Sequence, residues 1–169
     1  MKKLKCYHYC ENSFYEELLQ KEIIEANDEV IIPDEKLAEH YVKEYAFKVK
    51  KMNNGNGMFF AWSNPAYKGN IEFCDNGKYS LLELEVEEDM VVKTNYENWC
   101  SFGMDLYDND GDINEADEYC REIGIVDGIN GSYNAIFDCS DQHSEIQILL
   151  PYIKKDWIQS VKRCVKKYI

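Results

Sequence analysis

His8 is the first residue whose type and setting could serve chemistry. It alternates with Cys6 and Cys10 on one face of a predicted strand at 4–10. A zinc site built from these three residues fails on geometry. Alternate strand residues lie about 6.6 Å apart, whereas tetrahedral zinc needs every ligand about 2.0–2.3 Å from one point. Two interpretations stay open for His8: a core-facing or pocket-edge histidine, which the pattern favours, and a histidine that contacts a ligand.

Glu145 is a second candidate, because it directly precedes a hydrophobic run with the pattern of a buried strand. A carboxylate in this setting is suited to stabilising positive charge at a reacting centre. An exposed glutamate at the start of a strand explains the same pattern, and the usual exposure of glutamate favours that simpler interpretation.

An acidic stretch in the second half of the chain is similar to part of a calcium loop. If Gly111 takes position six of such a loop, Asp108 and Asp110 fall at positions three and five. Asp117 then falls at position twelve, but Leu106 occupies position one, where the first carboxylate is needed. The spacing therefore favours a solvated turn over a calcium site. The candidate metal ligands are Asp108, Asp110, Asp112 and Asp117.

The formal net charge of −13 excludes some classes of function. A phosphate backbone would be repelled, so nucleic-acid binding is not expected. Between Asp105 and Glu122, eight carboxylates stand against Arg121 alone. The whole segment 105–132 is polar and punctuated by glycine, and we predict that it is loop-rich, with one helix near 115–123. A solvated surface explains this acidity, and a basic protein partner is the more specific alternative.

The cysteines and the N-terminus predict a cytoplasmic location. Seven cysteines are scattered singly without a Cys-x-x-Cys pair, which is typical of reduced thiols. Met1–Lys5 is basic, but polar residues follow in place of the apolar region of a signal peptide. No apolar run is long enough to span a bilayer, so no membrane association is expected.

The elements that must position these residues predict an α+β fold. We expect a single domain, 1–169, with a mixed, mostly antiparallel sheet and flanking helices. Two capping boxes, Ser13 with Glu16 and Thr94 with Glu97, mark helix starts, and Trp62 and Trp99 are predicted core residues. Strands are predicted at 4–10, 30–32, 59–62, 71–73, 79–86 and 146–150, and helices at 13–26, 34–52, from 94 past 102, and from 154 to 168.

Short motifs over most of the chain resemble an uncharacterised bacterial family, the domain-of-unknown-function 3841 family. The resemblance implies one domain in a bacterial or phage cytoplasm and no established activity. His8 departs from the pattern, because such proteins usually carry glutamine in the first strand. The similar motifs are Phe59–Trp62, Leu82–Val92, Asn95–Trp99, Ile136–Asp138 and Ile146-Gln147 with Trp157-Ile158.

At the level of fold, the chain also resembles the ADP-ribosyltransferases. That fold often begins with a Tyr-His strand and a helix, as Tyr7-His8 and the helix predicted from Ser13 do. It often ends with a glutamate that opens a hydrophobic strand, as Glu145 does, and a strand with small residues and serine, here Ala61–Ser63, lies between.

This second resemblance implies NAD as the ligand and assigns roles to five residues. His8 donates a hydrogen bond to the nicotinamide ribose, and the ring of Tyr41 or Tyr45 stacks on the nicotinamide. Glu145 stabilises the oxocarbenium-like centre as nicotinamide leaves, with Ser63 in support. The implied catalytic residues are His8, Tyr41 and Glu145, and the implied cofactor-binding residues are His8, Tyr45 and Ser63.

Two functions of different classes stay open. The first is a nucleotide-binding protein with an ADP-ribosyltransferase-like core, and it requires His8 and Glu145 to converge in one cleft. The second is a non-enzymatic acidic inhibitor or antitoxin that binds a basic protein, and it requires only an exposed anionic face.

Overall fold

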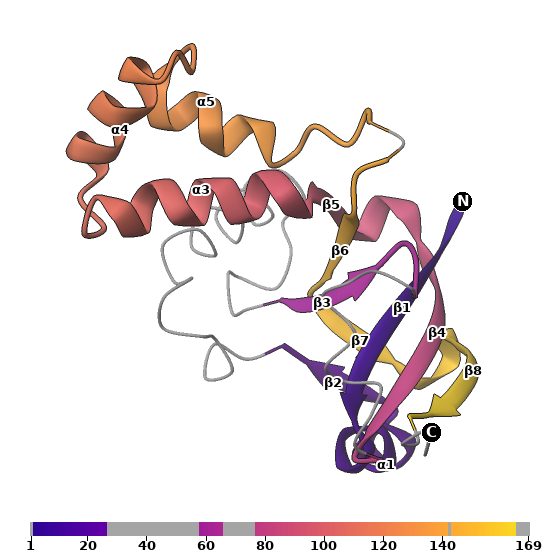
Figure 1. The fold of residues 1–169 in the computed structure, drawn as a ribbon. Helices are drawn as coiled ribbons and strands as arrows, with labels where there is room; N and C mark the ends of the chain where they lie inside the picture. Colours follow the sequence, from indigo (N-terminus) through magenta and orange to yellow (C-terminus); the bar gives the residue numbers. More distant parts are fainter. Residues whose placement is uncertain (1, 27–57, 66–76, 142, 165–169) are drawn as a thin grey trace, which may run out of the picture. The chain divides into compact units, whose positions relative to one another are not determined.

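The computed structural model describes residues 2–26, 58–65, 77–141 and 143–164, and there the fold is α+β (Figure 1). An antiparallel sheet has the strand order β5-β6-β3-β1-β4-β8, and β2 and β7 form a small second sheet. Helices accompany the strands, so the predicted fold class and mostly antiparallel sheet are confirmed. The described residues form two compact units: a sheet unit (2–26, 58–65, 77–92 and 147–164) and a helical unit (93–141 and 143–146).

The sheet unit is built around β1 (Lys3–Glu11). Along its full length β1 pairs antiparallel with β4 (Tyr79–Glu87). On its other side β1 pairs with β3 (Phe59–Trp62) at one position, Tyr7 opposite Trp62. β3 pairs in turn with β6 (Ile146–Leu150), with Trp62 opposite Gln147. The strands β1, β3 and β6 are therefore neighbours in the sheet.

Alternating side chains of these strands form the core of the sheet unit. Cys6, His8 and Cys10 are buried on one face of β1, as the alternation predicts. On β4 the buried residues are Ser80, Leu82, Leu84 and Val86. β6 differs from its predicted alternation, since Gln147 to Leu150 are all buried, and both faces of this strand are therefore covered.

The first helix is shorter than predicted. α1 (Asn12–Lys21) follows β1 directly and has Glu11 as its N-cap, so Ser13 lies inside the helix. The Ser13 hydroxyl donates to the Glu11 carboxylate at 3.3 Å, and the predicted capping box is therefore wrong. Glu22 ends the helix in a left-handed conformation, φ 67°. The residues predicted to continue it form β2 (Ile23–Glu25), because pairing with β7 (Tyr152–Lys154) outweighs local helical spacing.

The predicted C-terminal helix from 154 is wrong. β7 leads into a 3-10 turn (Lys155–Trp157) and then into β8 (Ile158–Arg163), which pairs with β4. Trp157 is buried as predicted and stacks on Tyr152, with ring centroids 5.2 Å apart. The spacing of Trp157 and Val161 suits one helix face, but edge pairing with β4 satisfies the backbone of this segment instead.

The helical unit follows β5 (Val92–Asn95), which is a strand outside the predicted set. α3 (Tyr96–Asp108) begins at Asn95, whose side-chain oxygen accepts a hydrogen bond from the Asn98 N–H at 3.1 Å. Asn95, and not the predicted Thr94, is therefore the N-cap. Trp99, a predicted core residue, is buried in this helix, and so is Phe102.

The segment 105–132 is mostly helical, so the prediction of a loop-rich segment is wrong. It contains the end of α3, all of α4 (Ile113–Glu122) and the start of α5 (Gly128–Ala135). Its acidity conceals helix signals, because Asp112 accepts hydrogen bonds from the N–H groups of Asn114 and Glu115 as the N-cap of α4. The single helix predicted near 115–123 corresponds to α4.

Other predicted elements lie outside the described residues: the strands at 30–32 and 71–73 and the helix at 34–52. None of the described helices is long and apolar enough to cross a membrane.

Candidate functional site

His8 lies in the middle of β1 with 8% of its surface exposed. Its Nδ1 lies 2.8 Å from the carbonyl oxygen of Phe60 in β3. A carbonyl oxygen only accepts hydrogen bonds, so Nδ1 carries a proton. β1 and β3 have a single paired position, Tyr7 with Trp62. The imidazole thus adds a side-chain link between β1 and β3.

The buried imidazole of His8 is neutral at pH 7. Burial lowers its pKa, and the hydrogen bond to the Phe60 carbonyl opposes that shift more weakly. With the proton on Nδ1, Nε2 presents a lone pair and is an acceptor. No described residue forms a hydrogen bond with Nε2. Buried polar atoms are nearly always paired, so an acceptor without a partner among the described residues is unusual.

Two aromatic rings that the sequence analysis did not select surround His8. Phe14 of α1 and Phe59 of β3 contact the imidazole edge-on, with ring centroids 5.9 and 5.7 Å away. The two phenyl rings also contact each other at 5.4 Å. An apolar surround with one convergent polar atom is typical of small-molecule sites. The alternation of Phe59 with Ala61 along β3 was the available signal for one of these rings.

Ser63 lies next to the strand that holds His8 in place. It directly follows β3, one residue after Trp62, and is half-buried. Its role in ligand binding stays a prediction. Tyr41 and Tyr45, the two predicted stacking residues, lie outside the described residues.

Glu145 directly precedes β6 and is half-buried. Its backbone carbonyl accepts a hydrogen bond from the Tyr96 N–H at 2.9 Å, which joins it to the start of α3. Glu145 belongs to the helical unit and His8 to the sheet unit. The convergence of these two side chains therefore stays a prediction.

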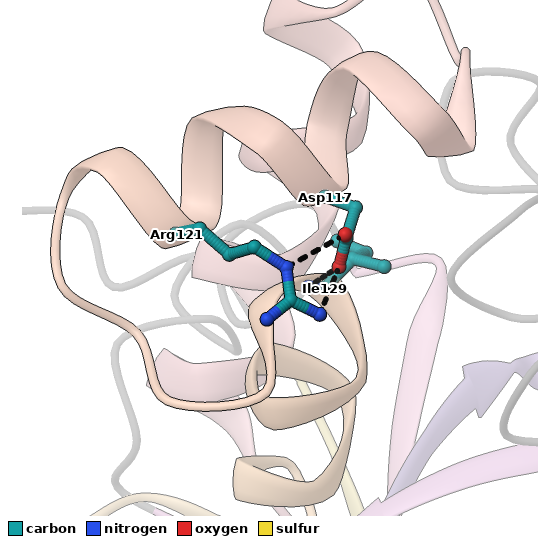
Figure 2. A network of polar contacts seen from close by, with 3 residues as sticks. All are labelled: Asp117, Arg121 and Ile129. Carbon is teal, nitrogen blue, oxygen red and sulfur yellow. Dashed lines mark hydrogen bonds and ion pairs between the residues drawn. The ribbon is translucent and has the colours of Figure 1, made fainter.

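Two of the four candidate metal ligands, Asp112 and Asp117, have other partners. Asp112 caps α4, and the Asp117 carboxylate accepts hydrogen bonds from Arg121 Nε at 2.9 Å and the Ile129 N–H at 3.0 Å (Figure 2). The bond from Arg121 and then that from Ile129 lower the pKa of Asp117. Within the described ranges, no group of three or more His, Cys, Asp or Glu side chains is placed to hold a metal ion.

A polar junction connects the three helices of the helical unit. The Oδ2 atom of Asp105 in α3 accepts hydrogen bonds from Ser132 Oγ in α5 at 2.9 Å and Cys120 Sγ in α4 at 3.6 Å. Burial, followed by the Asp105 charge, raises the pKa of Cys120 to about 11. The thiol is therefore protonated at neutral pH and unsuited to nucleophilic catalysis. The Asp105 carboxylate therefore links α3 to both α4 and α5.

No protein-family model matches this chain, and no curated protein or solved structure matches it. The two family resemblances therefore stay predictions.

Proposed function

We propose that this protein binds NAD or a related nucleotide through an ADP-ribosyltransferase-like core centred on His8. The observation that carries the proposal is the buried imidazole, fixed through Nδ1 by the Phe60 carbonyl, whose Nε2 has no hydrogen-bond partner among the described residues. In this tautomer a ribose hydroxyl donates to Nε2. The bond therefore runs in the opposite sense to the one implied by the family resemblance, in which the histidine donates.

The strand order supports the proposal. The strands β1, β3 and β6 are consecutive neighbours in the sheet. Trp62 pairs with Gln147 in antiparallel register, so the C-terminal end of β3 lies beside the N-terminal end of β6. Ser63 follows β3 in sequence, and Glu145 precedes β6. Ser63 therefore directly follows a neighbour of β1, the strand that carries His8.

The proposed reaction breaks the bond between the nicotinamide nitrogen and C1′ of the ribose. Nicotinamide leaves with the electron pair and becomes neutral, while positive charge develops on the ribose. The Glu145 carboxylate stabilises that charge. A nucleophile, either water or an acceptor side chain, then bonds to C1′ and loses its proton to solvent. Phe14 and Phe59 supply an apolar wall beside His8.

The test is the effect of NAD on the melting temperature. At an NAD concentration about 100-fold above Kd, binding stabilises the native state by about 2.7 kcal/mol, which raises the melting temperature by roughly 5–10 °C for a chain of this size. The His8→Phe variant keeps a ring but loses both nitrogens, and it is expected to lose this NAD-dependent rise. The rise is measured within each variant, so a lower starting stability does not affect the comparison.

The matched control is His143→Phe, because His143 is exposed and lies in the other compact unit. This variant is expected to keep the full NAD-dependent rise. A wild-type protein that NAD does not stabilise, or a His8→Phe variant that NAD stabilises equally, would show that the proposal is wrong.

The helical unit favours a second function, the binding of a basic protein without catalysis. The observation behind it is the set of exposed carboxylates on α4 that form no ion pair with any described residue: Glu115, Glu118 and Glu122. An acidic inhibitor or antitoxin would use such a surface to attract a cationic partner. Both functions are proposed for a reducing cytoplasm, in which cysteines stay as thiols.

A further inference from the structure

Exposed apolar side chains gather in the helical unit. Among the residues that the structure describes, eight large hydrophobic side chains are exposed, and six of them lie between Met104 and Val126. Ile123 is 54% exposed and Val126 is 80% exposed. Single exposed apolar residues are ordinary on a protein surface, but a group of them within one unit is typical of an interaction site.

The exposed side of α4 and its C-cap combine two of these apolar residues, Tyr119 and Ile123, with carboxylates. Ala116 and Cys120 are fully buried and define the inner face of the helix. Tyr119 and Ile123 are four residues apart, so they adjoin along one side of α4. Three other exposed positions of the helix carry carboxylates: Glu115, Glu118 and Glu122.

The negative charge on this face is not neutralised locally. Arg121 is the single basic residue of α4, and its guanidinium is bonded to Asp117 at 2.9 Å. No described residue forms an ion pair with the three outer carboxylates. An apolar edge bordered by unpaired negative charge is complementary to an apolar surface bordered by Lys or Arg.

The turn that carries Val126 is fixed in place. The N–H of Ile125 donates to the Cys120 carbonyl at 2.9 Å, and the Ile129 N–H donates to the Asp117 carboxylate at 3.0 Å (Figure 2). These bonds join the end of α4 to the start of α5. A surface that is ordered before binding loses less conformational entropy when a partner docks.

We propose that the outer face of α4 is a docking surface for a basic amphipathic helix of a partner protein. The apolar side chains of that helix cover Tyr119, Ile123 and Val126, and its flanking Lys or Arg residues pair with the carboxylates. The proposal rests on the second function above and is independent of the nucleotide site. The docking surface is defined as Glu115, Glu118, Tyr119, Glu122, Ile123 and Val126.

The test uses a synthetic amphipathic peptide of leucine and lysine, about 18 residues long so that it forms roughly five helical turns. A control peptide has the same composition but a scrambled order that distributes leucine around the helix. Binding to the full chain is measured by fluorescence anisotropy at several salt concentrations. The amphipathic peptide is expected to bind at least about tenfold more tightly than the scrambled one, because only it presents a continuous apolar face.

Two variants separate charge from apolar contact. Glu115→Gln/Glu118→Gln/Glu122→Gln is expected to weaken binding about tenfold and to reduce the salt dependence. Tyr119→Ser/Ile123→Ser is expected to weaken binding about tenfold and to leave the salt dependence intact. The matched control, Glu16→Gln/Glu25→Gln/Asp89→Asn, removes three exposed carboxylates from the sheet unit and is expected to keep the affinity within about twofold.

The outcomes distinguish a failure of the α4 docking surface from a failure of the proposed binding of basic proteins. If all three variants bind the amphipathic peptide like the wild-type protein, the acidic chain still binds basic partners, but the α4 surface is wrong. If neither peptide binds, the second function fails together with the surface. Sedimentation velocity tests whether a second copy of this chain occupies the surface instead. A wild-type dimer that Tyr119→Ser/Ile123→Ser dissociates would assign the face to a second copy and overturn the proposal.

Discussion

The Glu145→Gln variant is expected to cleave NAD about 10²–10³-fold more slowly than the wild-type protein. Glutamine has nearly the same shape as glutamate but no negative charge, so the variant loses the stabilisation of the oxocarbenium-like centre. Its backbone bond from the Tyr96 N–H is unaffected, and the fold is expected to persist. The rate is measured as nicotinamide released over time by chromatography.

A second variant controls for the loss of charge. Glu16→Gln makes the same substitution at an exposed position of α1 and is expected to cleave NAD at the wild-type rate. Circular dichroism establishes that both variants are folded. Equal rates for Glu145→Gln and wild type would remove Glu145 from the reaction, although NAD binding at His8 would be a separate question.

Gly128→Ala is expected to lower the free energy of unfolding by about 2–4 kcal/mol. Gly128 has φ 58°, a left-handed conformation that costs other residues about 1–2 kcal/mol. A Cβ atom there would overlap Oδ1 of Asp117 and lie 2.8 Å from its Cγ. Asp117 would have to move, leaving the Ile129 N–H without its acceptor and disrupting the ion pair with Arg121 (Figure 2).

Urea denaturation of variants at two other glycines separates the cost of the left-handed backbone from the cost of displacing Asp117. Gly124 also has a left-handed conformation, φ 89°, but a Cβ there would meet nothing within 4 Å. Gly124→Ala is therefore expected to cost only about 1–2 kcal/mol. Gly103 lies inside α3 with open space around it, and Gly103→Ala is expected to be neutral or stabilising by up to about 1 kcal/mol. Equal losses for Gly128→Ala and Gly124→Ala would mean that the Asp117 network contributes nothing to stability.

The sequence predicted those elements whose local pattern agrees with their tertiary surroundings. β1 and β4 alternate because one face of each strand is buried, and Cys6, His8 and Cys10 lie on one buried face of β1 as the alternation predicts. Trp62 and Trp99 were predicted to pack in the core, and both are buried. These positions needed no knowledge of which strands are neighbours.

Elements whose conformation depends on pairing with distant segments could not be predicted from their local sequence pattern. Residues 158–163 have apolar spacing that suits a helix, but pairing with β4 decides their conformation. Ile23–Glu25 leaves its predicted helix for the same reason, since β7 lies more than a hundred residues later. The helix content of 105–132 was underestimated because aspartate and asparagine signal both turns and N-caps.

The surroundings of His8 show the same limit for the site. The sequence selected His8 from its strand position, and the structure confirms that it is buried. The carbonyl of Phe60 and the ring of Phe59 come from a strand fifty residues away, and no local pattern joins that strand to β1. The tautomer of His8, and with it the direction of the proposed ligand bond, follows from that contact alone.

The most direct measurement is the nitrogen NMR spectrum of the histidine rings during an NAD titration. Before NAD is added, His8 is expected to show a neutral ring with the proton on Nδ1, and to stay neutral below the usual histidine pKa because burial lowers its own. NAD is expected to shift the Nε2 resonance of His8 and to leave exposed His143 unchanged. A His8 spectrum that stays constant up to millimolar NAD would contradict the proposed nucleotide site.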